Sequence, residues 1–206
     1  LGKKIDSFEY EGIKYTPQTF LEFTKIQPKD YITITSFTHK PFNSKFILNI
    51  PDNFSNGTYY NVPLSNLVEI VNSALKKGYT IELDCDVSEP TFSSKHGIAV
   101  IPRDIKDEKE ILETLKPEKE ISQSLRQQEF ENQNTTDDHL MHITGLLKNQ
   151  NGAFYKVKNS WGSDSKRVKN GGYIYMSEAY FKLKAISITI HKDAIPKKYL
   201  KNLMNP

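Results

Sequence analysis

The last third of the chain contains four short segments in close succession that each have the pattern of a β-strand. They are residues 139–147, 153–161, 171–177 and 185–191. In the last of them Ile186, Ile188 and Ile190 alternate with other residues, which places them on one face of a strand. A run of strands with short connections is typical of an antiparallel sheet, so the second half is predicted to be β-barrel-like.

The first part of the chain mixes strands with helices. We expect a hairpin at 5–15, strands at 30–37, 45–51 and 79–87, and a loop at 51–62, which is rich in turn-forming residues. Thr16-Pro17 has the pattern of an N-cap followed by a first-turn proline, which predicts a short helix.

The clearest helix is predicted at residues 63–77, where Pro63 begins it and Gly78 ends it. Its apolar residues form one stripe: Leu64, Leu67, Val68, Val71 and Leu75. Together these patterns predict an α+β protein, with a mixed region at 1–78, a β-barrel-like lobe at 79–206, and an exposed, charged helical insertion at about 103–133.

Composition excludes several classes of function. The 206 residues carry 28 Lys and Arg against 25 Asp and Glu, a net charge of +3, which gives no support for nucleic-acid binding. The lysine-rich stretch 182–201 is expected to be a solvated surface. No window approaches the roughly 18 apolar residues of a membrane span. One cysteine rules out a disulfide framework and a multi-cysteine metal site, and no cofactor is expected.

A histidine and an asparagine in two of the predicted strands suggest a catalytic pair. His139 begins the first of these strands, and Asn159 lies 20 residues later near the end of the next. An asparagine oxygen can accept the N–H of an imidazole and fix its tautomer, which leaves the other ring nitrogen free to take a proton from a thiol. Trp161 is placed to cover that hydrogen bond and exclude water.

The segments "DHLMHITG", "FYKVKNSWG" and "GGYIYMSEAYF" resemble the His–Asn half of papain-like cysteine proteases. Further stretches, among them "YTPQTF", "DYITITSFTHKPF" and "ALKKGYTIELDCDVSEP", look most like the bleomycin hydrolase and aminopeptidase C branch. The resemblance implies a papain-like fold, with His139 as general base, Asn159 as the orienting amide and Trp161 as a shielding indole. It also implies peptide substrates, aminopeptidase action and homo-oligomers.

The catalytic cysteine of that family has no counterpart in this sequence, because no Gln…Gly-x-Cys-Trp segment is present. The chain resembles the C-terminal half of the family, so we expect the thiol to come from a missing or separate N-terminal portion and the isolated chain to be inactive. Leu1 would then be a cut end. The compartment stays open: cytoplasmic, or periplasmic or secreted if an upstream signal peptide was removed.

Cys85 is a poor substitute for the missing nucleophile. Acidic residues surround it in the sequence, namely Glu82, Asp84, Asp86 and Glu89. Nearby carboxylates disfavour a thiolate, so Cys85 is interpreted as a structural strand residue.

Other polar residues leave alternatives open. Asp137 and Asp138 precede His139 and could tune its charge or contact a substrate amine, whereas His142 should lie on the opposite strand face. Neither Asp137/Asp138 nor Asp84/Asp86 has a third metal ligand at a defined spacing, so no metal is expected. The rival hypothesis is a non-catalytic binding or scaffold protein that keeps the protease-like lobe without the nucleophile.

Overall fold

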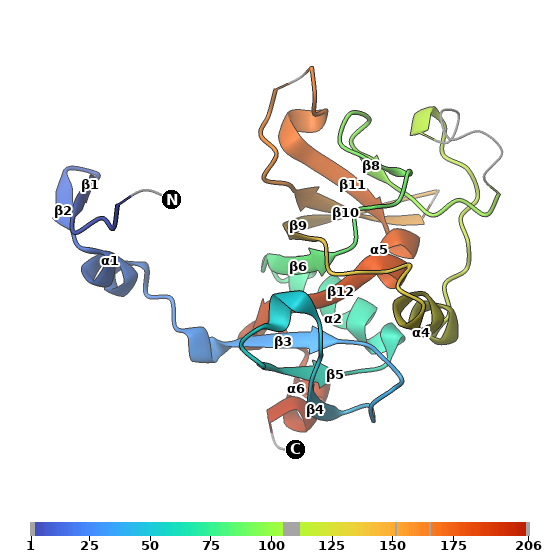
Figure 1. Ribbon diagram of the computed structural model, residues 1–206, viewed down its shortest axis with the longest axis horizontal. Helices are drawn as coiled ribbons and strands as arrows, with labels where there is room; N and C mark the ends of the chain where they lie inside the picture. Colours follow the sequence, from blue (N-terminus) through green and yellow to red (C-terminus); the bar gives the residue numbers. More distant parts are fainter. Residues whose placement is uncertain (1–2, 105–111, 151, 165, 205–206) are drawn as a thin grey trace. The chain divides into compact units, whose positions relative to one another are not determined.

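The computed structural model describes residues 3–104, 112–150, 152–164 and 166–204 (Figure 1). The chain divides into two compact units, Leu1–Tyr31 and Ile32–Pro206. Within the described part of the chain, no helix is both long enough and apolar enough to cross a membrane.

The smaller unit contains the predicted hairpin and the predicted short helix. Strands β1 (Phe8–Tyr10) and β2 (Ile13–Tyr15) pair in antiparallel fashion. Helix α1 (Pro17–Thr24) begins after Thr16, whose hydroxyl accepts the Thr19 N–H at 3.2 Å. Phe20 contacts three rings of the hairpin edge-on at 5.1–5.3 Å between centroids, which holds the helix against the strands. A 3₁₀ turn, η1 (Pro28–Asp30), follows.

The larger unit is built on a ten-stranded sheet with the order β4-β5-β3-β12-β6-β9-β10-β11-β8-β7. The strands are β3 (Tyr31–Thr35), β4 (Ser44–Ile47), β5 (Thr58–Asn61), β6 (Ile81–Cys85), β7 (Phe92–Ser93), β8 (Ile98–Ala99), β9 (His139–Asn149), β10 (Gly152–Lys158), β11 (Tyr173–Ser177) and β12 (Ala185–His191). Pairs β3–β5 and β8–β11 are parallel, whereas β4–β5, β6–β12, β6–β9, β9–β10, β10–β11 and β7–β8 are antiparallel. The predicted α+β class with a mostly antiparallel sheet is confirmed. Strands from both sides of residue 78 share this sheet, and the regional division there stays a prediction.

Helix α2 (Leu64–Lys76) lies at the predicted place and buries the predicted stripe except Leu75, which is partly buried against the core. Leu67 and Val71 are completely buried, in the same hydrophobic core as Leu83 of β6 and Ile188 of β12. Gly78 follows the helix with φ +84°, a left-handed conformation that favours glycine. The remaining helices are α4 (Gln123–Glu131), α5 (Glu178–Lys184) and α6 (Lys197–Met204), with 3₁₀ turns η2 (Pro51–Asn53), η3 (Asn170–Gly172) and η4 (Lys192–Ala194).

One sequence prediction of local structure was wrong, and one helix was not predicted. Residues 51–62, expected to be a loop, contain η2 and strand β5, because Tyr59 and Tyr60 pair with Phe46 and Lys45 of β4. The link between β11 and β12 contains helix α5, which Ser177 caps by accepting the Tyr180 N–H at 3.0 Å.

The predicted charged insertion and the lysine-rich surface are also corrected in part. Helix α4 lies within 103–133, but its Arg126 and Gln127 are buried. The guanidinium of Arg126 donates to the backbone carbonyls of Ser36 and Lys182. Residues 105–111 of the predicted insertion lie outside the described residues. Lys184, expected on a solvated surface, is fully buried at the end of α5.

Candidate active site

The structure brings His139 and Asn159 into direct contact. His139 is the first residue of β9, and Asn159 directly follows β10, the antiparallel neighbour of β9. The ring nitrogen Nε2 of His139 lies 2.8 Å from Oδ1 of Asn159. His139 is half-buried and Asn159 is 5% exposed, so the contact is largely shielded from water. The geometry expected from the sequence is present, while the catalytic roles of the two residues stay a prediction.

A second hydrogen bond fixes which end of the Asn159 amide faces the imidazole. The backbone N–H of Ser160 donates to Oδ1 of Asn159 at 2.7 Å. With the amide reversed, its NH₂ group would oppose that donor. We therefore assign the oxygen to the ring side and a proton to Nε2 of His139. In the neutral imidazole Nδ1 is then the acceptor, which is the protonation state that a general base requires.

Trp161 lies against the imidazole. The ring centroids of His139 and Trp161 are 4.9 Å apart with an interplanar angle of 35°, and Phe92 contacts the indole edge-on at 6.0 Å. Trp161 is 41% exposed, so part of its indole ring faces solvent. The position supports the predicted shielding of the His–Asn hydrogen bond.

Two glycines shape the segment that follows Asn159. Gly162 and Gly172 both have left-handed φ angles, +86° and +84°. The Gly172 carbonyl accepts the Asn159 N–H at 3.1 Å, and a Cβ on Gly172 would lie 2.3 Å from the Gly162 oxygen. A side chain at position 172 would therefore displace the backbone that holds Asn159 and Trp161. Gly171 and Gly172 lie in η3, the turn that leads directly into β11.

Cys85 has the wrong environment for a nucleophile. It faces His139 in the register of β6 and β9, but its side chain is completely buried in the core and its thiol contacts the Asp86 carbonyl oxygen at 3.3 Å. Burial raises the pKa of the Cys85 thiol well above its usual value, and the carboxylates of Asp84 and Asp86 raise it further. The thiol therefore stays protonated at neutral pH, in line with the structural role expected from the sequence.

Asp137 and Asp138 tie the segment before His139 to neighbouring elements. Asp137 Oδ2 accepts the Asp52 N–H at 2.8 Å. Asp138 accepts the Thr136 hydroxyl at 2.6 Å and the Val87 N–H at 3.3 Å. These contacts hold the segment directly before His139 against the backbone of Asp52 and Val87. The tuning and substrate-contact roles considered from the sequence stay predictions.

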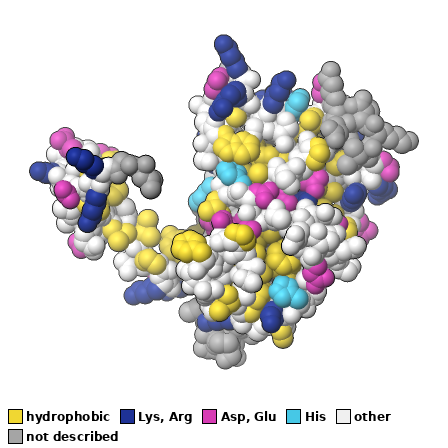
Figure 2. Space-filling view, viewed as in Figure 1, with side chains coloured by type: hydrophobic (Ala, Val, Ile, Leu, Met, Phe, Trp, Pro, Cys, Tyr) yellow, Lys and Arg dark blue, Asp and Glu magenta, His cyan; other side chains and the backbone are white. Residues whose placement is uncertain are grey.

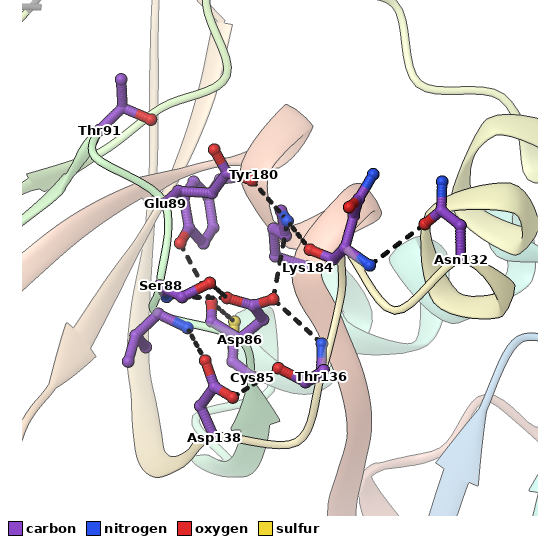
Figure 3. Close-up of polar contacts among 12 residues, drawn as sticks. Cys85, Asp86, Ser88, Glu89, Thr91, Asn132, Thr136, Asp138, Tyr180 and Lys184 are labelled. Atoms are coloured by element: carbon purple, nitrogen blue, oxygen red, sulfur yellow. Dashed lines mark hydrogen bonds and ion pairs between the residues drawn. The ribbon is translucent and has the colours of Figure 1, made fainter.

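A largely buried ion-pair network holds the segment that precedes His139 in place (Figure 3). The ammonium of Lys184 lies 2.5 Å from Glu89 and 3.6 Å from Asp86, and it donates to the Asn134 carbonyl. Asp86 also accepts the N–H groups of Ser88 and Thr136 at 2.7 and 3.0 Å. Although burial raises the pKa of Asp86, these hydrogen bonds and Lys184 hold it below its usual value. The network fixes the path of the chain into β9 and thus the position of His139.

Replacing Lys184 with methionine should destabilise the protein by about 3 kcal/mol, because it leaves the buried Asp86 carboxylate without its ammonium partner. Urea unfolding followed by circular dichroism measures the change. The matched control is Lys182→Met: Lys182 is partly exposed in an i,i+4 pair with Glu178, and its loss should change stability by about 0.5 kcal/mol or less. Equal effects of the two substitutions would contradict the role given to Lys184.

Sequence reasoning missed three residues that matter at this site. Phe92 supports Trp161, Lys184 supports the segment before His139, and Asp84 is a buried carboxylate near it. Asp84 gave no usable signal, because the alternation of Glu82 and Asp84 with apolar residues in β6 is typical of an exposed polar strand face. Within the described ranges, no group of three or more His, Cys, Asp or Glu side chains is arranged to hold a metal ion.

Comparison with known proteins agrees with the papain-like fold. A model of the Peptidase C1-like family matches residues 4–206, so the chain belongs to that family. It is 25% identical to aminopeptidase C of Listeria innocua over 217 residues and 22% identical to aminopeptidase C of Lactococcus lactis subsp. cremoris over 200 residues. The matches cover 98% and 93% of this chain.

The crystal structure of PepW from Lactobacillus rhamnosis has a similar fold, with a TM-score of 0.71 at 21% identity over 97% of this chain. The resemblance to aminopeptidase C stated from the sequence is confirmed. The chain spans about half the length of these relatives: 46% and 43% of the two aminopeptidases and 45% of PepW.

Proposed function

We propose that this chain forms the His–Asn side of a cysteine-peptidase active site, and that a thiol from residues outside this sequence completes it. The observation that carries the proposal is the 2.8 Å contact between Nε2 of His139 and Oδ1 of Asn159. It orients an imidazole whose second nitrogen is free to accept a proton.

In the proposed reaction, Nδ1 of His139 takes the proton of the thiol, and the resulting thiolate attacks the carbonyl carbon of the scissile amide. The imidazolium then gives its proton to the departing amine as the C–N bond breaks, which leaves a thioester. Water, deprotonated by the same nitrogen, attacks the thioester and releases the acid and the thiol. Asn159 holds the ring through both steps, and Trp161 keeps water away from the His–Asn hydrogen bond.

The thiol is assigned to another segment because Cys85 cannot serve. Its side chain is fully buried, and burial together with two carboxylates holds its thiol in the neutral form. No movement short of opening the core would bring its sulfur to a substrate.

The relatives named aminopeptidase C suggest the substrate class, namely peptides cleaved at the N-terminal residue. Homo-oligomers, which the resemblance implies, belong to the same proposal. Both features concern the whole protein rather than this chain alone.

The direct test is hydrolysis of aminoacyl-amidomethylcoumarins by this chain, alone and after co-expression with the polypeptide encoded upstream of Leu1. We expect no hydrolysis by the chain alone, hydrolysis by the assembled protein, and no change on Cys85→Ala. Activity of the isolated chain that Cys85→Ala abolishes would make Cys85 the nucleophile. If the upstream polypeptide contains no cysteine and the assembled protein hydrolyses nothing, a non-catalytic binding or scaffold protein is favoured instead.

A further inference from the structure

A pocket of about 300 Å³ opens on the polar face of the central strands, beside His139. Glu82 and Asp84 of β6 and Leu140 of β9 form part of its floor, and Asp52, Phe54 and Tyr59 line it from the segment around η2 and β5. Strand register places Asp84 opposite Leu140, which is the residue after His139. Figure 2 shows acidic side chains gathered across the middle of the visible face of the larger unit.

Asp84 is the unusual residue of this pocket. It is 3% exposed, and neither of its carboxylate oxygens has a hydrogen-bond partner among the described residues. Glu82, on the same face, does hydrogen-bond to Thr189. A buried carboxylate without a partner is destabilising, so its retention at a pocket wall suggests a ligand that supplies the missing partner.

The charges around Asp84 favour a cation. Burial raises the pKa of Asp84 to about 8, and Asp137, Glu82, Asp52 and Asp138 raise it further through their negative charge. Burial, together with the negative charges of Asp84, Glu82, Asp52 and Asp137, raises the pKa of Tyr59 to about 12. Among the described residues that line the pocket, none is a lysine or arginine. The site is therefore a region of concentrated negative potential.

The lining also distinguishes between kinds of cation. The described residues include no group of three or more ligands arranged for a metal ion. Phe54 and Tyr59 instead provide aromatic surface, which attracts alkylammonium and guanidinium groups as well as packing against their carbon chains. A volume of about 300 Å³ is large enough for an amino-acid side chain.

We propose that this pocket binds a cationic group of the peptide substrate, an ammonium or a guanidinium, through the carboxylate of Asp84. The proposal rests on the proposed function, because the pocket begins one residue from His139 and the bound group would belong to the peptide being cleaved. Asp137 links the two sites: its carboxylate accepts the N–H of Asp52, which lines the pocket.

Binding can be measured on this chain without any catalysis. The carboxyl carbon of Asp84 is followed by ¹³C NMR at pH 7 while three probes are added: alaninamide, which has only an α-ammonium; N-acetyl-lysinamide, which has only a side-chain ammonium; and neutral N-acetyl-norleucinamide. We expect one or both cationic probes to move the Asp84 signal toward its ionised position, and the norleucine probe not to do so. The responding probe identifies which part of the peptide enters the pocket.

Asp84→Asn should weaken binding of the responding probe by about tenfold or more, because it removes the charge that contacts the cation. Asp104→Asn, the same substitution at an exposed position, should leave binding unchanged. Asp84→Asn replaces a buried carboxyl group with a neutral amide of the same size and should fold well. Equal affinity of the two variants, or binding of the neutral probe as tight as that of the cations, would overturn the proposal.

The two proposals fail separately. Cation binding that depends on Asp84, in a protein that hydrolyses nothing when assembled, would leave the pocket assigned and refute the catalytic proposal. Hydrolysis by the assembled protein, with no response of Asp84 to any cationic probe, would do the reverse.

Discussion

Replacing His139 with alanine is expected to lower kcat/KM for aminoacyl amides by on the order of 10⁴-fold in the assembled protein, this chain together with the segment that carries the thiol. The loss is large because the imidazole acts in both halves of the reaction. It takes the proton of the thiol during acylation, and it activates water during hydrolysis of the thioester.

The matched control is His142→Ala. His142 lies three residues along the same strand and is exposed, whereas His139 contacts Asn159 and Trp161. We expect kcat/KM of this variant to stay within about twofold of the parent. If His139→Ala kept more than a tenth of the activity, or His142→Ala lost as much, the general-base assignment would be wrong.

Asn159 should behave as a positioning residue in the same assay. Its amide oxygen accepts both the imidazole N–H and the Ser160 N–H, so Asn159→Ala frees the ring to rotate and to change tautomer. The loss in kcat should be smaller than for His139→Ala, and the acid limb of the pH–rate profile should shift. A uniform loss with no change in the pH profile would indicate a structural role only.

Local sequence patterns predicted most elements of the fold, and the failures have identifiable causes. Helix α2 was predicted because its apolar stripe, its starting proline and its following glycine all agree. Strand β5 was missed because its turn-forming residues dominate the local pattern, whereas pairing with β3 and β4 decides the structure. Helix α5 was missed for a different reason. It is only seven residues long, and tertiary packing of Tyr180 and Phe181 holds it in place.

The candidate site divides in the same way. His139 and Asn159 could be found because strand pattern and residue type together predicted an imidazole beside an amide. Asp84 and Lys184 could not, because an aspartate in a strand and a lysine in a basic stretch are both normally exposed. Only the assembled sheet shows that one carboxylate is buried without a partner and that one ammonium is buried between two carboxylates.

The second large effect concerns Asp84 and the dependence of stability on pH. The pKa of its carboxyl group is raised from an ordinary value of 3.8 to about 8 by burial and by the charges of Asp137, Glu82, Asp52 and Asp138. Between these two pH values the unfolded chain releases the proton while the folded protein keeps it. The contribution of Asp84 to the free energy of unfolding therefore falls as pH rises from about 4 to about 8, and it levels off above that range.

Asp84→Asn removes this dependence, since the amide does not titrate. The variant should become progressively more stable than the parent as pH rises, with a difference on the order of 4 kcal/mol at pH 8. Urea unfolding at pH 5, 6, 7 and 8 measures it, and Asp104→Asn, at an exposed position, should follow the parent throughout. Parallel curves for the parent and Asp84→Asn would mean that Asp84 titrates normally.

The stability that Asp84 removes is itself an argument for its use. A protein gains by replacing such a residue with a neutral one unless the charge has a function, and pKa values shifted this far gather at functional sites. A cation bound in the pocket would let Asp84 ionise in the folded state, which lowers its pKa and reverses part of the loss. The parent should therefore gain stability near pH 8 when the cationic probe that shifts Asp84 is added, and Asp84→Asn should gain none. Gain by both would place the probe at another site on the protein.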